Sequence, residues 1–187
     1  MEEFPVDFAD MKAAFYRGEF TQVITELDSL RRHFLPEQLP TSVFVYGGLA
    51  RYYSGDFVGA IRQYEQAIRI DDECGAALSN LAYIYACCPD KGFHDAATAV
   101  ALAERASELS NWSDGNCIEV LAAAHARGGD FSKAESYLLL AQELGPPNKQ
   151  EGLRKLLEMV RLRQAICGDV FEDFKRCQRD FGDSSEP

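Results

Sequence analysis

The sequence predicts an all-α protein built from repeated helical hairpins, and three observations support this prediction. Apolar residues recur with the 3.6-residue period of a helix, and no run shows the period of two that marks a strand. The stretch 41–74 reads as two helices joined by a short turn. A signal of Gly, an acidic residue and Phe marks that turn, and it recurs in the same phase at Gly18, Gly55 and Gly129. A hairpin that returns at a fixed spacing predicts a stacked repeat architecture.

The hairpin 41–74 predicts a first helix over 43–53 and a second over 57–70. Ser54-Gly55 ends the first helix, because glycine adopts the left-handed conformation of a helix C-terminus at low cost. Asp56 opens the second helix, because an acidic residue suits a helix N-terminus. Gly47-Gly48 lies within the first helix, and small residues there let two helices approach closely. We therefore expect this glycine pair to serve packing and not phosphate binding.

The remaining chain divides into further copies of this hairpin. The stretch 115–148 is in register with 41–74, and Asp114 is a candidate N-cap. The stretch 75–114 is a third copy, with extra residues between its helices in the segment CCPDKGFHD. The stretch 4–40 is a degenerate copy, with helices expected over 4–17 and 20–34.

Two helices are expected after the last hairpin. The run 150–164 places an apolar stripe on one side, formed by Leu153, Leu156, Leu157 and Val160. Such a helix caps a repeat array by covering its last apolar face. A second helix is expected over 169–179, so that 149–180 forms the cap. We predict one array over 1–180 and a disordered polar tail over 181–187.

The length and layout of these hairpins resemble the tetratricopeptide repeat, and the resemblance covers roughly residues 4–148. It implies an α-α superhelix, a right-handed solenoid of helix–turn–helix units. The chain departs from the family pattern at several positions. Arg51 and His125 stand where the family has a tyrosine, and the proline that ends a repeat survives only as Pro146. We expect His125 to be a packing residue.

The resemblance also implies a binding surface, since the first helices of successive repeats line a concave groove in this family. The side chains expected there are Val45, Leu49, Tyr52, Tyr53, Ser79, Tyr83, Asn116, Glu119 and Arg127. Aromatic rings with a polar rim suit a peptide or helix of a partner protein. Two other interpretations stay open. A terminal helix could fill the groove, or these rings could complete the core.

Charge and composition restrict the partners. The formal net charge is -11 at pH 7, which argues against nucleic acid and against anionic membrane surfaces. The first ten residues contain four acids and no apolar run, so we expect no secretory signal. No stretch approaches eighteen consecutive apolar residues. These features predict a cytoplasmic protein, and the high charge favours a monomer over a homo-oligomer.

Residues that could carry chemistry are few. The six cysteines are expected to be reduced packing residues, because disulfide frameworks belong to secreted chains. Cys87, Cys88 and His94 lie near the long inter-helix loop, but adjacent cysteines chelate one ion poorly, so a Pro-Asp turn is preferred over a metal site. No nucleophile–base, phosphate-binding or zinc-protease motif occurs. We expect no catalytic residues, no metal and no cofactor.

We therefore expect a non-enzymatic scaffold or adaptor that binds a peptide or helix of another protein. A secretion-system chaperone with similar repeats is an alternative, and a self-assembling structural unit is another. A thiol or metal protein is a third. The lysine and asparagine set with which some family members clamp a C-terminal carboxylate is mostly missing. Its positions hold Phe8, Lys12, Tyr46 and Ala76, and only Asn80 matches.

Overall fold

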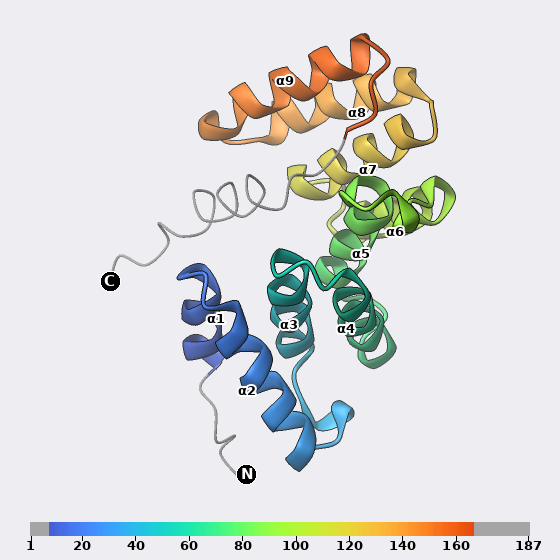
Figure 1. The fold of residues 1–187 in the computed structure, drawn as a ribbon. Coiled ribbons are helices and arrows are strands. Elements are labelled where there is room, and N and C mark those ends of the chain that lie inside the picture. Colours follow the sequence, from blue (N-terminus) through green and yellow to red (C-terminus); the bar gives the residue numbers. More distant parts are fainter. Residues whose placement is uncertain (1–7, 167–187) are drawn as a thin grey trace. The chain divides into compact units, whose positions relative to one another are not determined.

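The computed structural model of the chain describes residues 8–166, all of whose longer elements are α-helices (Figure 1). The described residues form two compact units, 8–72 and 73–166. The division falls close to the predicted end of the 41–74 hairpin. The prediction of an all-α protein is confirmed, since successive helices pack against their neighbours and the described part contains no strand.

The first unit contains two hairpins. Its helices are α1 (Phe8–Tyr16), α2 (Phe20–His33), α3 (Thr41–Tyr53) and α4 (Phe57–Ile70), with a short 3-10 turn, η1 (Pro36–Gln38), between α2 and α3. Helix α1 packs on α2 and α3, and α3 packs on both α2 and α4. The largest fully buried side chains of this unit include Phe15, Leu27, Phe44 and Tyr64. The predicted bounds of α4 match, and α3 begins two residues earlier than expected.

The second unit contains two further hairpins and a capping helix. Its helices are α5 (Gly75–Cys87), α6 (Ala96–Leu109), α7 (Gly115–Arg127), α8 (Phe131–Leu144) and α9 (Gln150–Arg161), with 3-10 turns η2 (Lys91–Phe93) and η3 (Pro147–Lys149). From α6 to α9 each helix packs on the one before it, and α7 also packs on α5. A buried cluster runs through this unit from Ala86 of α5 to Val160 of α9. The unit is thus held by contacts between successive repeats.

The turns within three of the hairpins have the same construction. Gly18, Gly55 and Gly129 have φ angles of +79°, +82° and +84°, in the left-handed region. At each turn, the backbone N–H groups of the glycine and of the residue after it bond carbonyl oxygens in the last turn of the helix. In the second hairpin, the N–H of Gly55 bonds the carbonyl of Tyr52, and that of Asp56 bonds the carbonyl of Arg51. The Asp56 carboxylate then accepts from the N–H of Gly59 at 2.9 Å and begins α4. The expected turn chemistry is confirmed.

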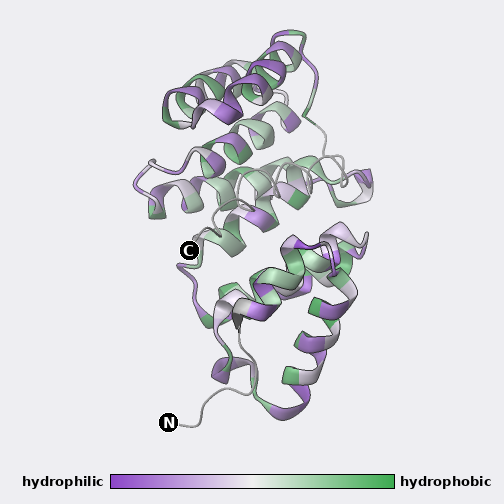
Figure 2. Ribbon diagram, turned by 90° about the vertical axis from the view of Figure 1, so that its left-hand side faces the viewer, coloured by the Kyte–Doolittle hydropathy of each residue, from purple (hydrophilic) through white to green (hydrophobic). Residues whose placement is uncertain are grey.

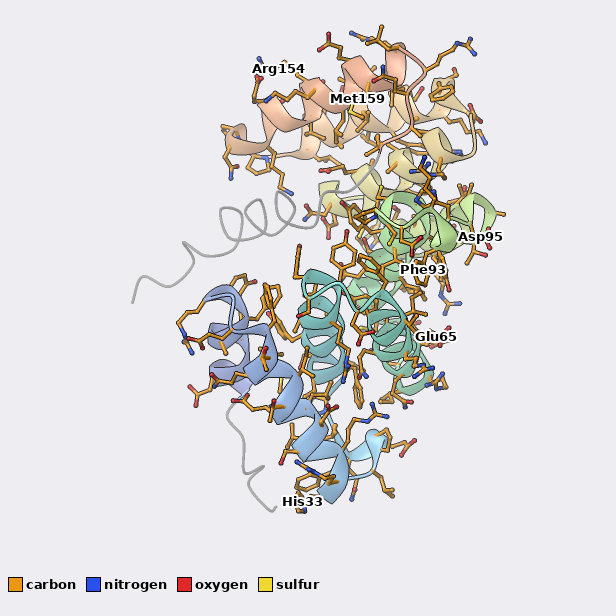
Figure 3. The ribbon with its side chains drawn as sticks, viewed as in Figure 1. His33, Glu65, Phe93, Asp95, Arg154 and Met159 are labelled. Carbon is orange, nitrogen blue, oxygen red and sulfur yellow. The ribbon has the colours of Figure 1, made fainter. Side chains whose placement is uncertain are left out.

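The long loop of the third hairpin is held by short-range hydrogen bonds. Asp90 accepts from the N–H of Gly92, and Asp95 accepts from the N–H of Thr98 at the start of α6. His94 Nε2 lies 2.7 Å from the carbonyl oxygen of Cys88. Phe93 and Asp95 lie beside the start of α6 (Figure 3). The insertion therefore replaces a glycine turn without separating α5 from α6, which remain packed together.

Close packing explains the two glycines inside α3. A Cβ atom built on Gly48 would lie 2.5 Å from Cε1 of Tyr64, and one on Gly47 would overlap Leu27. The prediction that this pair serves packing is confirmed. Arg51 forms ion pairs with Asp28 of α2 at 3.1 Å and with Asp56 at 2.9 Å. Two ion pairs thus link Arg51 of α3 to α2 and to the N-cap of α4.

Helix α9 covers the end of the second unit, as expected of a cap. Leu153, Leu157 and Val160 are buried, and polar residues alternate with apolar ones along the helix (Figure 2). Arg154 is exposed and points away from the molecule (Figure 3). The helix ends at Arg161, three residues before the predicted end, because Arg163 adopts a left-handed φ of +55°. The predicted helix 169–179 and tail 181–187 lie outside the described residues.

Candidate functional site

The nine residues predicted to line the groove differ from one another in burial. Tyr52 and Val45 are buried, at 3% and 9% exposure. The other seven are half-buried, namely Leu49, Tyr53, Ser79, Tyr83, Asn116, Glu119 and Arg127. Four of the nine belong to the first unit and five to the second.

In the first unit the two predicted groove tyrosines pack against other aromatic rings. Tyr53 stacks on Phe20 of α2 with ring centroids 5.7 Å apart, and it lies 5.8 Å from Phe15 of α1. Tyr52 makes an edge contact with Tyr53 at 5.2 Å and a tilted contact with Phe57 at 5.5 Å. Tyr53 therefore joins α1 and α2 to α3, and Tyr52 offers little surface to a partner.

In the second unit the corresponding positions hold small side chains and one cation. We call this surface the α5–α7 face, and it consists of Tyr83, Ala86 and Cys87 of α5 with Ala123, Ala126 and Arg127 of α7. Ala86, Cys87, Ala123 and Ala126 belong to one buried cluster, and Tyr83 packs against that cluster. Small side chains leave room above a helix pair for a segment of chain.

A segment of the same unit lies on this face. The chain leaves the end of α9 and runs back towards α7 (Figure 1). We call residues Leu162–Ile166 the strap. Ile166 is 6% exposed and belongs to the cluster of Ala86, Cys87, Ala123 and Ala126. Arg127 Nη2 donates to the carbonyl oxygen of Ile166 at 3.0 Å, and Arg127 Nε donates to that of Ala86 at 2.6 Å. Arg127 thus ties the strap to the C-terminal end of α5.

The remaining predicted residues of the second unit lie nearer the start of α7. Asn116 accepts a hydrogen bond from Nζ of Lys149, which precedes α9. Ser79 lies beside the thiol of Cys117, which donates to Oδ2 of Asp114 at 3.6 Å. Burial, with a smaller contribution from the Asp114 carboxylate, raises the pKa of Cys117 to about 11. The thiol is therefore protonated at neutral pH and unsuited to nucleophilic chemistry.

Sequence reasoning missed a stack of three rings in the second unit. His125 lies over Tyr137 at 5.5 Å and 15°, and Tyr137 lies over Trp112 at 6.1 Å and 12°. His125 is 6% exposed, as expected of a packing residue, while Trp112 is 38% exposed. The buried Nε2 of His125 has no hydrogen-bond partner among the described residues. Burial lowers the pKa of His125, and the nearby Lys133 ammonium lowers it further.

The cysteines and histidines of residues 8–166 form no metal or disulfide cluster. Cys87 and Cys88 are fully buried, and the cysteines at 74, 87, 88 and 117 form no disulfide with one another. His33, the third histidine, is exposed at the end of α2 (Figure 3). Within residues 8–166, no three side chains of His, Cys, Asp or Glu form a group that could hold a metal ion.

None of the helices within residues 8–166 combines the length and the apolar content needed to cross a bilayer.

A comparison with protein-family models finds no match for this chain, and a comparison with curated proteins finds none either. The resemblance to the tetratricopeptide repeat therefore rests on the residues quoted above and on the helical hairpins that they form.

Proposed function

We propose that the chain is a non-enzymatic scaffold of tetratricopeptide-like repeats that binds an extended segment of another protein on the α5–α7 face. One observation carries this proposal. The face holds a non-helical segment of its own chain, whose Ile166 side chain lies in the buried cluster and whose Ile166 carbonyl oxygen accepts from Arg127. A surface that accepts one such segment has the shape and donors to accept another.

The chemistry of the face supports a binding role. Its apolar floor gives non-directional affinity, while the guanidinium of Arg127 recognises a backbone carbonyl and fixes the register of the bound segment. Tyr83 adds a half-buried ring on the same helix as Ala86 and Cys87. Rings of this kind contribute large contact area at small entropic cost. None of these groups is arranged as a nucleophile with a base.

The face can be tested by photo-crosslinking in cells. A photoreactive phenylalanine analogue is placed at Tyr83, and in a matched control at Leu139, which lies on α8 and is 43% exposed. We expect a specific partner to crosslink at position 83 and not at position 139. Equal crosslinking at both positions, or crosslinking at 139 alone, would place binding elsewhere.

The crosslinked segment then serves as a ligand in a titration. We expect Tyr83→Ala to weaken its binding at least about tenfold, because truncating a central interface tyrosine typically costs about 2 kcal/mol. Circular dichroism of the same variant checks that helicity is retained. Undiminished binding with retained helicity would remove Tyr83 from the site.

A further inference from the structure

The strap is built to reverse the chain and return it to the α5–α7 face. After α9, the N–H of Arg163 bonds the carbonyl of Val160, and the N–H of Gln164 bonds that of Met159. These are the two bonds of a Schellman motif, in which the residue at the left-handed position is normally glycine. Here that residue is Arg163, with φ +55°. The turn sends the chain away from the helix axis.

The two ends of the strap differ sharply in exposure. Leu162 is 63% exposed, whereas Ile166, four residues later, is 6% exposed. Both are large aliphatic residues, so the sequence alone does not distinguish them. Only Ile166 belongs to the buried cluster and has its carbonyl oxygen on Arg127. The strap is therefore anchored at one side chain and one backbone group.

Arg127 links the strap to the scaffold through a second carbonyl. Its Nε donates to Ala86, the penultimate residue of α5, whose carbonyl is one of the last four and has no partner within that helix. A cation at this end of the helix is also favoured by the helix dipole. The guanidinium is thus held by α5 and presents its Nη2 to whatever chain lies on the face.

We propose that the strap is an intramolecular ligand of the α5–α7 face, and that the partner is an extended segment that replaces it. This inference rests on the function proposed above and adds the partner's chemistry. The partner places one aliphatic side chain where Ile166 lies, and the carbonyl oxygen of that residue accepts from Arg127. Recognition of a side chain class and a backbone group admits many sequences that share one aliphatic anchor.

The strap then sets the affinity of the site. A tethered segment acts at an effective concentration of about millimolar, so a free segment competes with it at a disadvantage. The apparent dissociation constant of the free segment equals its intrinsic value divided by the fraction of chains in which the strap has left the face. Release of the strap is therefore expected to tighten binding of a free segment at least about tenfold.

The experiment uses the full chain and a peptide of known sequence. The probe is the acetylated and amidated peptide VRLRQAI, which copies residues 160–166. It is titrated to millimolar concentration against the wild type, Ile166→Asp and Leu162→Asp, with the Arg127 Nε–H resonance as the readout. Leu162→Asp is the matched control, because it adds the same charge to the same segment at an exposed position.

We expect the peptide to shift the Arg127 resonance of Ile166→Asp at concentrations at least about tenfold lower than in the wild type or in Leu162→Asp. A peptide with Asp in place of its isoleucine should cause no shift. If Ile166→Asp loses helicity, Ile166→Ala gives the same comparison with a milder change. The Ile166→Ala chain should show the same order of affinities.

Two results would overturn the inference, and they differ in what they say about the proposed function. Equal midpoints for all three chains would show that the strap does not compete, while the face still binds peptide. No shift in any chain up to millimolar peptide would show that the strap's sequence has no affinity for the face. In that case crosslinking at Tyr83 decides the proposed function independently.

Discussion

The same repeat positions hold different side chains in the two units, and they do different work. Tyr52 and Tyr53 of α3 correspond to Ala86 and Cys87 of α5 and to Ala126 and Arg127 of α7. In the first unit the two rings contact other aromatic side chains and join helices. In the second unit the small side chains leave a surface on which the strap lies. The repeat position thus fixes the direction of a side chain. The size of that side chain decides whether it fills the core or leaves a surface on which another segment can pack.

The largest effect is expected from Tyr52→Ala, which tests whether the first unit uses this position for its core. Tyr52 is 3% exposed, so its truncation should lower the free energy of unfolding by about 3 kcal/mol or more, through lost burial and a cavity. Urea unfolding followed by circular dichroism measures the change. Val58→Ala, at an exposed position of α4, is the control and should change the value by less than about 0.5 kcal/mol. A small effect of Tyr52→Ala would mean that the ring is not part of the core and is available for binding.

A second comparison uses two helical glycines, Gly48 at a close contact between helices and Gly152 at a position with no neighbouring atom within 4 Å. Gly48→Ala places a Cβ atom against Tyr64, which is 1% exposed, and overpacking of this kind costs about 1–3 kcal/mol. Gly152→Ala in α9 meets no atom within 4 Å and should stabilise by about 0.5–1 kcal/mol, because alanine favours the helix. Thermal melts of the two variants should therefore move in opposite directions. Stabilisation by Gly48→Ala would mean that α3 and α4 are not closely packed at Gly48.

The glycine pair of α3 illustrates what the sequence could predict. Local signals were sufficient for the helix over 57–70, for the turn glycines and for the cap at Asp56, because each depends on neighbours within about four residues. Close packing at Gly47 and Gly48 followed from residue size alone.

The candidate site was less predictable, because its contacts join distant parts of the chain. The repeat register placed Arg127 one residue after Ala126 on α7, but it carried no sign of its hydrogen-bond partners, which are 41 and 39 residues away. Helical periodicity carries no information about such a pair. The stack of His125 on Tyr137 was missed for the same reason. Leu162 and Ile166 could not be ranked, since burial of the strap depends on where the chain goes after α9.

The second unit should lose stability on mild acidification, and the first offers no buried histidine among its described residues. Burial and then Lys133 lower the pKa of His125, while Asp130 and Glu104 oppose the shift. Because the pKa of His125 is lower in the folded state than in the unfolded state, the unfolded state binds the proton more readily. Stability is therefore full above about pH 6.5 and falls as the pH drops towards the folded pKa, by about 1.4 kcal/mol for each unit between the two pKa values.

This dependence is measured by urea unfolding between pH 7.5 and 5, a range chosen to lie above most carboxyl titrations. His125→Phe keeps a ring over Tyr137 and removes the titration, so its stability should be flatter across that range. An unchanged slope in His125→Phe would assign the acid sensitivity to another group.

The smallest effect concerns the turn that forms the strap. Arg163→Gly should stabilise the chain by about 1 kcal/mol or less, because glycine occupies the left-handed region without the penalty that a Cβ atom brings. Replacement of Gly129, whose φ is +84°, by alanine is the converse change in a turn of the same kind and should destabilise. Thermal melts compare the two. Destabilisation by Arg163→Gly would mean that the arginine side chain contributes more than its backbone strain costs.

The most direct test is whether the strap lies on the α5–α7 face in solution. Isoleucine and alanine methyl groups are labelled with carbon-13 in the full chain, and nuclear Overhauser effects are recorded from the methyls of Ile166. We predict cross-peaks to at least one of the Ala86, Ala123 and Ala126 methyls, together with a slowly exchanging Nε–H on Arg127. Methyl shifts of Ile166 at random-coil values, with no cross-peak to any alanine of α5 or α7, would contradict the account that the strap lies on this face.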